Sequence, residues 1–212
     1  MRPINIRQYI NPLAAIASSL ILVACSSSSD SDSDSDSDNG SIENQSVLTL
    51  LDGTWTRNCV ALPDGTFSFR DTVIIDGDTT ERIRENFNDT DCQLAISETS
   101  FDASVTFGEP GVIAESGLTS QQVDSLIGET RITPLSDATT LQLNSEEFCG
   151  VSDYSTGTEQ AIAIECFPTL GEGMLFELWA VDGDMLFFGL EQALTVEERA
   201  TTLDVARPFF RQ

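Results

Sequence analysis

The chain of 212 residues contains no histidine and no lysine, so its ten arginines carry all of the positive side-chain charge. A serine hydrolase needs a base beside its nucleophile, and histidine or lysine supplies that base in the common arrangements. Without lysine, neither a Schiff base nor a phosphate-binding P-loop has its reactive group. Paired carboxylates remain as candidates, but so many acidic residues place some pairs close together by chance. The composition therefore predicts a protein that is not an enzyme and has no cofactor.

Basic residues are also few in number: 10 arginines stand against 35 acidic residues, a formal net charge of −25. Residues 41–212 alone carry 8 arginines and 30 acidic residues, which gives a net charge of −22. Such a surface repels the phosphates of nucleic acids and anionic head groups, so we expect no nucleic-acid partner. The acidic residues occur in every segment, which is typical of a solvated surface.

The first 25 residues have the layout of an export signal. Two arginines come first, an apolar run follows over residues 13–23, and the small Ala24 directly precedes Cys25. The run is much shorter than the roughly 20 residues of a membrane-spanning helix. Cleavage as an ordinary secretory signal would leave Cys25 as an odd cysteine. The stretch Leu22-Val23-Ala24-Cys25 resembles the lipobox of bacterial lipoproteins, and this resemblance implies that Cys25 carries a lipid that anchors the protein in a membrane.

The resemblance also divides the chain into a signal peptide (1–24), a lipidated cysteine with a Ser/Asp-rich linker (25–40) and a single folded domain (41–212). The linker has nothing apolar to bury and its like charges repel, so we expect it to be disordered. A calcium loop in the linker is disfavoured because the glycine comes one place late and Gln45 stands where an EF-hand has glutamate. We expect no metal site there. Ser26 after the cysteine, in place of an aspartate, favours the outer membrane.

Beyond the anchor, an even number of cysteines remains: Cys59, Cys92, Cys149 and Cys166. Exported proteins form disulfides, and these spacings do not match paired zinc ligands. Four cysteines allow three pairings. We predict the most local one, Cys59–Cys92 and Cys149–Cys166, because each pair flanks one hairpin-like unit.

Strand-like runs separated by turn residues dominate the domain. The predicted strands cover residues 54–60, 66–75, 79–87, 92–96, 101–107, 139–143, 160–167, 174–181 and 185–188. Asp64-Gly65, Asp76-Gly77-Asp78 and Asp182-Gly183 are hairpin signals between them. Short helices are predicted near 118–126 and over about 196–204, each from a cap-like start. The fold class is mainly β: an antiparallel meander forming a small barrel or a sandwich, with one or two short helices.

Gly53-Thr54-Trp55 on the first strand and Arg207 near the end of the chain resemble a pattern of lipocalin-like β-barrels. In that family the tryptophan closes one end of the barrel and the arginine packs across it. The resemblance implies that Trp55 and Arg207 are barrel-closing residues and that a ligand enters at the opposite end. The cysteine and aspartate pattern is also similar to that of uncharacterised lipoproteins of Gram-negative bacteria.

The aromatic residues of the last hairpin are the candidate ligand-binding residues: Phe176, Trp179, Phe187 and Phe188. On one hypothesis they line a cavity for a small apolar or amphiphilic ligand. On the other they fill the core, and the domain is a structural or protein-interaction lipoprotein that meets an envelope protein. A cavity favours the first hypothesis, and a sealed interior with an exposed apolar patch favours the second.

The lipid anchor gives the first testable prediction. Replacing Cys25→Ala removes the only acylation site that the lipobox offers, so we expect the protein to appear in a soluble fraction or to stay unprocessed. Membrane fractionation and the mass of the product measure this outcome. A Cys25→Ala protein that is still membrane-bound at the normal mature size would contradict the prediction.

Overall fold

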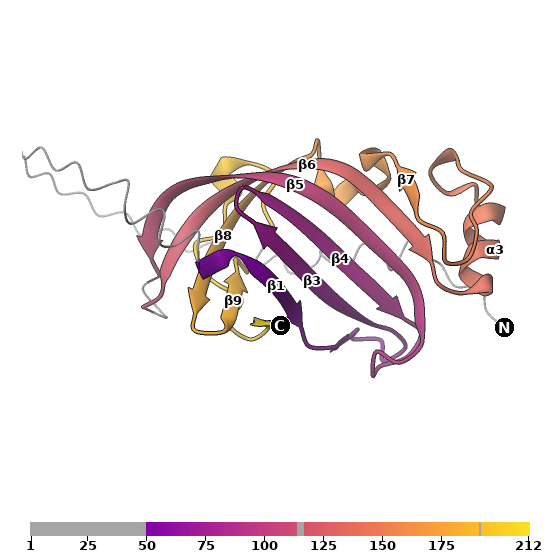
Figure 1. The fold of residues 1–212 in the computed structure, drawn as a ribbon, viewed down its shortest axis with the longest axis horizontal. Helices are drawn as coiled ribbons and strands as arrows, with labels where there is room; N and C mark the ends of the chain where they lie inside the picture. Colours follow the sequence, from indigo (N-terminus) through magenta and orange to yellow (C-terminus); the bar gives the residue numbers. More distant parts are fainter. Residues whose placement is uncertain (1–49, 114–116, 191) are drawn as a thin grey trace, which may run out of the picture.

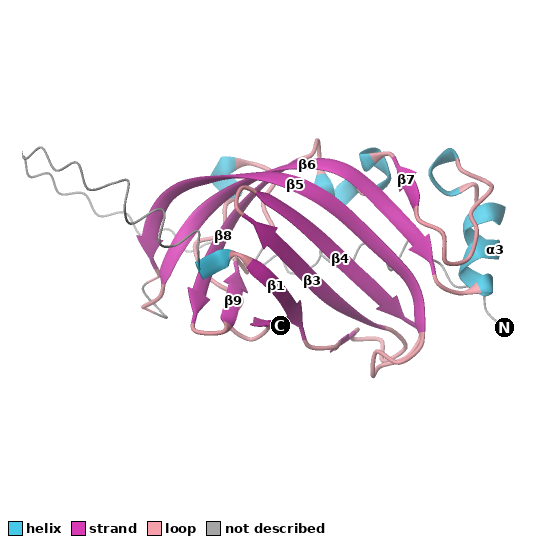
Figure 2. Ribbon diagram, viewed as in Figure 1, coloured by secondary structure: helices cyan, strands magenta, loops and turns pink. Residues whose placement is uncertain are grey.

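The computed structural model describes residues 50–113, 117–190 and 192–212 (Figures 1 and 2). Cys25, the signal peptide and the linker lie outside the described residues. The strands are β1 (Gly53–Arg57), β2 (Val60–Ala61), β3 (Ser68–Asp76), β4 (Thr79–Phe87), β5 (Ala95–Val112), β6 (Thr119–Pro134), β7 (Gln160–Ile162), β8 (Met174–Asp182), β9 (Met185–Phe188) and β10 (Phe209–Arg211). The helical segments include α3 (Asp137–Ser145) and the 3-10 turns η1 (Phe148–Gly150), η2 (Ile164–Cys166), η3 (Pro168–Leu170) and η4 (Val196–Glu198).

Eight of these strands close into an antiparallel barrel. Hydrogen-bonded neighbours follow the order β1-β10-β9-β8-β6-β5-β4-β3, and β1 also pairs with β3, which completes the circle. β1 therefore lies between the last strand and the third strand, with Trp55 opposite Arg211 on one side and Val73 on the other. Closure removes the exposed edges that an open sheet would leave. The barrel alternative of the predicted fold class is confirmed.

The two longest strands, β5 and β6, extend beyond the barrel (Figure 1). On the side of β6 away from β5, the start of the strand pairs with β8. From Thr130 to Ile132 the partner on that side is the short β7. The segment 137–173 packs on this part of β6 through its own apolar cluster, which includes Leu143 and Tyr154. Register shifts between Phe101 and Ala103 bend the β5–β6 pair, as a β-bulge does.

Local turn chemistry places the hairpins where the sequence predicts them. Gly77 and Gly183 have φ of 58° and 59°, a left-handed conformation that glycine adopts without a Cβ clash. They connect β3 to β4 and β8 to β9, and the bounds of β4 and β9 are as predicted. The two strands expected over 92–96 and 101–107 form one continuous strand, β5.

Four local predictions are wrong. The strand expected over 160–167 is only the short β7, because residues 164–166 form the 3-10 turn η2. Residues 118–126 do not form a helix but begin β6, because pairing with β5 and β8 on its two sides satisfies the backbone. Residues 139–143 lie in α3, not in a strand. Ser136 caps this helix by accepting a hydrogen bond from the Thr139 N–H at 3.2 Å, and Thr139 and Leu143 are buried at helical spacing.

The fourth wrong prediction is the helix over about 196–204, which is only the single turn η4. Thr195 makes no side-chain capping bond, and the chain becomes extended at Arg199. The Arg199 guanidinium instead donates to the carbonyls of Val123 and Glu177 at 3.2 and 3.0 Å. These bonds hold the segment after β9 against the outside of β8.

One end of the barrel is closed by Trp55, which is fully buried. Its Nε1 donates to the Leu51 carbonyl at 2.7 Å, and the guanidinium of Arg211 lies 4.1 Å from the ring centroid. Arg211 also donates to the carbonyls of Asp52 at 2.7 Å and Leu50 at 2.5 Å. A Cβ on Gly53 would lie 3.0 Å from Arg211 Nη1, so the glycine of the Gly-x-Trp pattern leaves room for the arginine.

Arg211, not Arg207, therefore covers the tryptophan, and the prediction for Arg207 is wrong. The β1–β10 register sets Arg211 directly across from Trp55. Arg207 lies before β10 and pairs with Asp204, with 2.7 Å between Nε and Oδ2. The predicted kind of contact is present, but it is made by an arginine four residues later.

This closure gives a stability prediction. Arg211→Ala removes two charge-assisted hydrogen bonds and a cation–π contact, so we expect the free energy of unfolding to fall by about 2–3 kcal/mol. The control is Arg207→Ala, which removes a partly exposed ion pair and should cost less than about 1 kcal/mol. Urea titration followed by tryptophan fluorescence measures both values. Equal losses in the two variants would contradict the role given to Arg211.

Candidate functional site

The barrel interior has two chemically different halves. Next to Trp55, the inward side chains are apolar and buried, among them Val73, Val105 and Val123. Toward the other end the inward positions carry charge. We call the five charged residues there the interior arginine cluster: Arg57, Arg82, Arg84, Asp71 and Glu177.

Arg82 and Glu177 form a buried ion pair across the barrel, from β4 to β8. Arg82 Nη1 donates to Glu177 Oε1 at 2.8 Å, and Nη2 donates to Oε2. The Ser125 hydroxyl donates to Oε2 at 2.8 Å. Three rings surround the guanidinium, with centroids 4.9 to 5.7 Å away: Phe188, Trp179 and Phe101. This pairing offsets the cost of burying the two charges.

Asp71 is shared by two arginines. It accepts hydrogen bonds from Arg84 Nε at 2.6 Å and Nη2 at 3.0 Å, and from Arg57 Nη1 at 3.3 Å. Each guanidinium also stacks on a ring, with 4.3 Å from Arg57 to Phe209 and 4.3 Å from Arg84 to Phe69. One carboxylate therefore faces two guanidiniums, which leaves one positive charge in excess.

The charged side chains of this half differ in exposure, and those of Arg57, Asp71, Arg82 and Glu177 are only 7–14% exposed. The side chain of Arg84 is 22% exposed, and the inward rings of Phe101 and Phe188 are only partly buried. Burial lowers the pKa of the Arg57 guanidinium; Asp71 and Asp204 oppose this shift, and nearby Arg207 adds to it. Arginine stays protonated at neutral pH even so, so Arg57 is a desolvated cation.

The four predicted ligand residues do not share one wall. Trp179 and Phe188 face inward and stack on each other, 5.3 Å between ring centroids. Phe176 lies on the outer face of β8, where the Arg199 guanidinium covers it at 5.6 Å. Phe187 is also outward and packs in a separate apolar cluster with Leu203. The period of two along a strand separates these neighbours.

Both predicted disulfides are confirmed. Cys59–Cys92 ties the chain after β1 to the loop before β5, and Cys149–Cys166 ties η1 to η2. Their Cα atoms are 5.8 Å apart in each case. The first bond lies near the arginine-lined end of the barrel, and both stabilise connections that are irregular in backbone.

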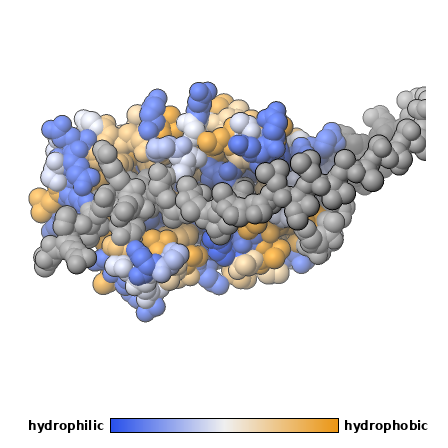
Figure 3. Space-filling view, turned by 180° about the vertical axis from the view of Figure 1, so that it is seen from behind, coloured by the Kyte–Doolittle hydropathy of each residue, from blue (hydrophilic) through white to orange (hydrophobic). Residues whose placement is uncertain are grey.

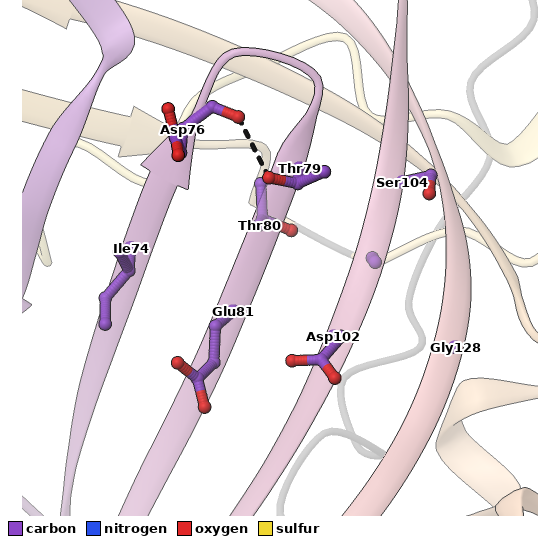
Figure 4. A pocket seen from close by; sticks show the side chains of 9 residues that line it. Ile74, Asp76, Thr79, Thr80, Glu81, Asp102, Ser104 and Gly128 are labelled. Carbon is purple, nitrogen blue, oxygen red and sulfur yellow. Dashed lines mark hydrogen bonds between the residues drawn. The ribbon is translucent and has the colours of Figure 1, made fainter.

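The outer face of β3 to β6 carries a hollow of about 340 Å³ (Figure 4). Glu81 and Asp102 line it, and so does Gly128 on β6, which has no side chain to fill the space. Arg131 donates to both oxygens of Asp102 at 2.7 Å, which holds the pKa of that carboxyl below its ordinary value. Because this carboxylate is already paired, we place the candidate site in the interior.

The described residues contain no group of three or more metal-ligating side chains that could hold an ion. They also include no helix with the length and apolar character needed to cross a bilayer. On the face in Figure 3, hydrophilic and hydrophobic residues are interspersed where the surface is described.

The sequence interpretation missed the interior arginine cluster. The signal was present in the alternation of β3 and β4. Asp71 lies two residues from the core residue Val73, and Arg82 and Arg84 are also two apart. Because side chains alternate along a strand, this spacing places the charged side chains of β3 and β4 on the face that carries Val73. Only the closed barrel shows that Arg57 joins them.

Comparison with protein-family models and with curated proteins finds no match for the chain. The fold and the site therefore define the class of this protein: a closed, eight-stranded antiparallel β-barrel, consistent with a lipocalin-like barrel. Within that class it is a barrel with a Trp–Arg closure at one end and a cation-rich interior at the other.

The buried ion pair gives a further prediction. Glu177→Leu leaves Arg82 without its partner, so we expect a loss of about 3–5 kcal/mol in the free energy of unfolding. The double variant Arg82→Met/Glu177→Leu removes both charges and should recover most of this loss. Glu129→Ala breaks an outer contact to Arg131 and serves as the control, with a change below about 1 kcal/mol. A double variant as unstable as Glu177→Leu in urea titration would contradict the prediction.

Proposed function

We propose that this protein is a lipid-anchored lipoprotein of the bacterial outer membrane whose acidic barrel is a non-catalytic binding module for a small amphiphilic ligand. Cys25 carries the anchor, and the Ser/Asp-rich linker holds the barrel away from the membrane surface. The observation that supports this function best is the asymmetry of the barrel interior.

That asymmetry has two parts. The half next to Trp55 is apolar and sealed, whereas the half with the interior arginine cluster is charged and partly open to solvent. Ligand sites combine apolar walls with a few placed polar groups. Half-buried rings beside guanidiniums, as at Phe101 and Phe188, supply this combination.

A second candidate is a structural or protein-interaction lipoprotein with a filled core. The tight packing around the fully buried Trp179, which stacks on Phe188 and meets Phe107 edge-on at 6.1 Å, favours it. In that case a partner in the envelope would meet the outer surface, where side chains such as Leu141 and Leu94 are exposed.

Native mass spectrometry of the full chain extracted from membranes tests the proposal. We expect a co-purified small molecule beyond the mass of the lipidated protein. An unrelated lipoprotein extracted from the same membranes is the control for lipid carried along by detergent. A protein free of ligand that cross-links in cells to one envelope protein would instead support the second candidate.

A further inference from the structure

The interior arginine cluster has more positive than negative charge, in a domain whose overall charge is strongly negative. Three guanidiniums face two carboxylates, Asp71 and Glu177. The nearby pair Arg207–Asp204 adds one charge of each sign beside Arg57. With 30 acidic residues in the domain, carboxylates that could complete the pairing are abundant in the sequence. The excess cation is therefore a specific property of the interior.

Two donors of this cluster, and a third beside it, have no hydrogen-bond partner in the described structure. Among the described residues, Arg57 Nε and Arg82 Nε are buried and make no hydrogen bond. The indole Nε1 of Trp179, which is fully buried beside Arg82, has no partner either. Buried donors are normally paired, and each exception in a folded protein calls for a partner such as a ligand or a water molecule. Burial also lowers the pKa of the Arg57 guanidinium, although Asp71 and Asp204 oppose this shift.

We propose that the end of the barrel lined by Arg57 and Arg84 binds the anionic head group of its ligand, a carboxylate, with the apolar part of the ligand against neighbouring rings. This inference rests on the proposed binding function and names the chemistry of its ligand. Arginine presents several N–H donors in a planar fork that matches a carboxylate. Arg84 is the more exposed of the two, so it is the first contact for an entering anion.

The position of the cluster fits an amphiphile. Phe69 and Phe209 stack under the two guanidiniums, and Phe101 and Phe188 lie around Arg82. A head group at the arginines therefore has apolar ring surface within reach. The opposite end is closed by the Trp55–Arg211 contact, so entry takes place at the arginine-lined end.

Isothermal titration calorimetry tests the inference on the full chain in phosphatidylcholine nanodiscs, with empty nanodiscs as the blank. The probes are octanoate, the neutral 1-octanol of equal chain length, and acetate. Arg84→Gln is expected to weaken octanoate binding about tenfold to hundredfold, the value of a charge-assisted hydrogen bond, and to leave 1-octanol binding unchanged. Arg70→Gln is the matched control, because it removes the same charge from the outer face of β3.

A second variant acts in the opposite direction. Asp71→Asn removes the shared carboxylate, so octanoate should bind to this variant at least as tightly as to the unaltered protein. Added octanoate should also raise the unfolding temperature of the variant. If Arg84→Gln does not fold, this variant and the preference of the unaltered protein for octanoate over 1-octanol still test the site.

The outcomes separate the two proposals. Equal binding of octanoate and 1-octanol, or equal effects of Arg84→Gln and Arg70→Gln, would overturn the anion site and leave the binding function in place. Binding of neither octanoate nor 1-octanol would overturn the binding function itself. Acetate binding as tightly as octanoate would support the anion site and assign it to free small anions, against the amphiphile.

Discussion

The closure of the barrel depends on one strand, β1, which pairs with β10 on one side and with β3 on the other. The contact between Trp55 and Arg211 secures this junction, because it joins the first and last strands and ties Arg211 to the carbonyls of Leu50 and Asp52. Gly53 makes the close approach possible. Without this junction the sheet would be open, and neither a sealed end nor a shielded interior would exist.

The scarcity of positive charge gives each arginine of the domain a defined place. The eight arginines from Arg57 to Arg211 each lie within ion-pair distance of a carboxylate in the described structure. Outside the barrel, Arg131 meets several acidic residues and relieves their mutual repulsion. Inside the barrel, the arginines of the interior arginine cluster outnumber its carboxylates. An interior with excess positive charge behind a surface with excess negative charge is the feature on which the proposed anion site rests.

The segment between β6 and β8 shows how the barrel accommodates a long insertion. It packs on the inner face of β6 beyond β8, with Leu143 and Leu175 in one cluster and the Cys149–Cys166 bond within it. A disulfide limits the freedom of the unfolded chain and so favours the folded state of such an irregular segment. This core stabilises the insertion, and the inward-facing Leu175 of β8 and Phe101 of β5 pack with it.

The sequence by itself determined the local features: the hairpins at Gly77 and Gly183, the bounds of β4 and β9, the mainly β class and the local disulfides. Turn conformation and short-range pairing depend on neighbouring residues, so they can be predicted from them. Only the tertiary structure decided that residues 118–126 form a strand, that Arg211 replaces Arg207 over Trp55, and that three arginines share the interior. These features depend on strand register and closure, which join residues as far apart in the sequence as Trp55 and Arg211, and no local pattern encodes which side chains then meet.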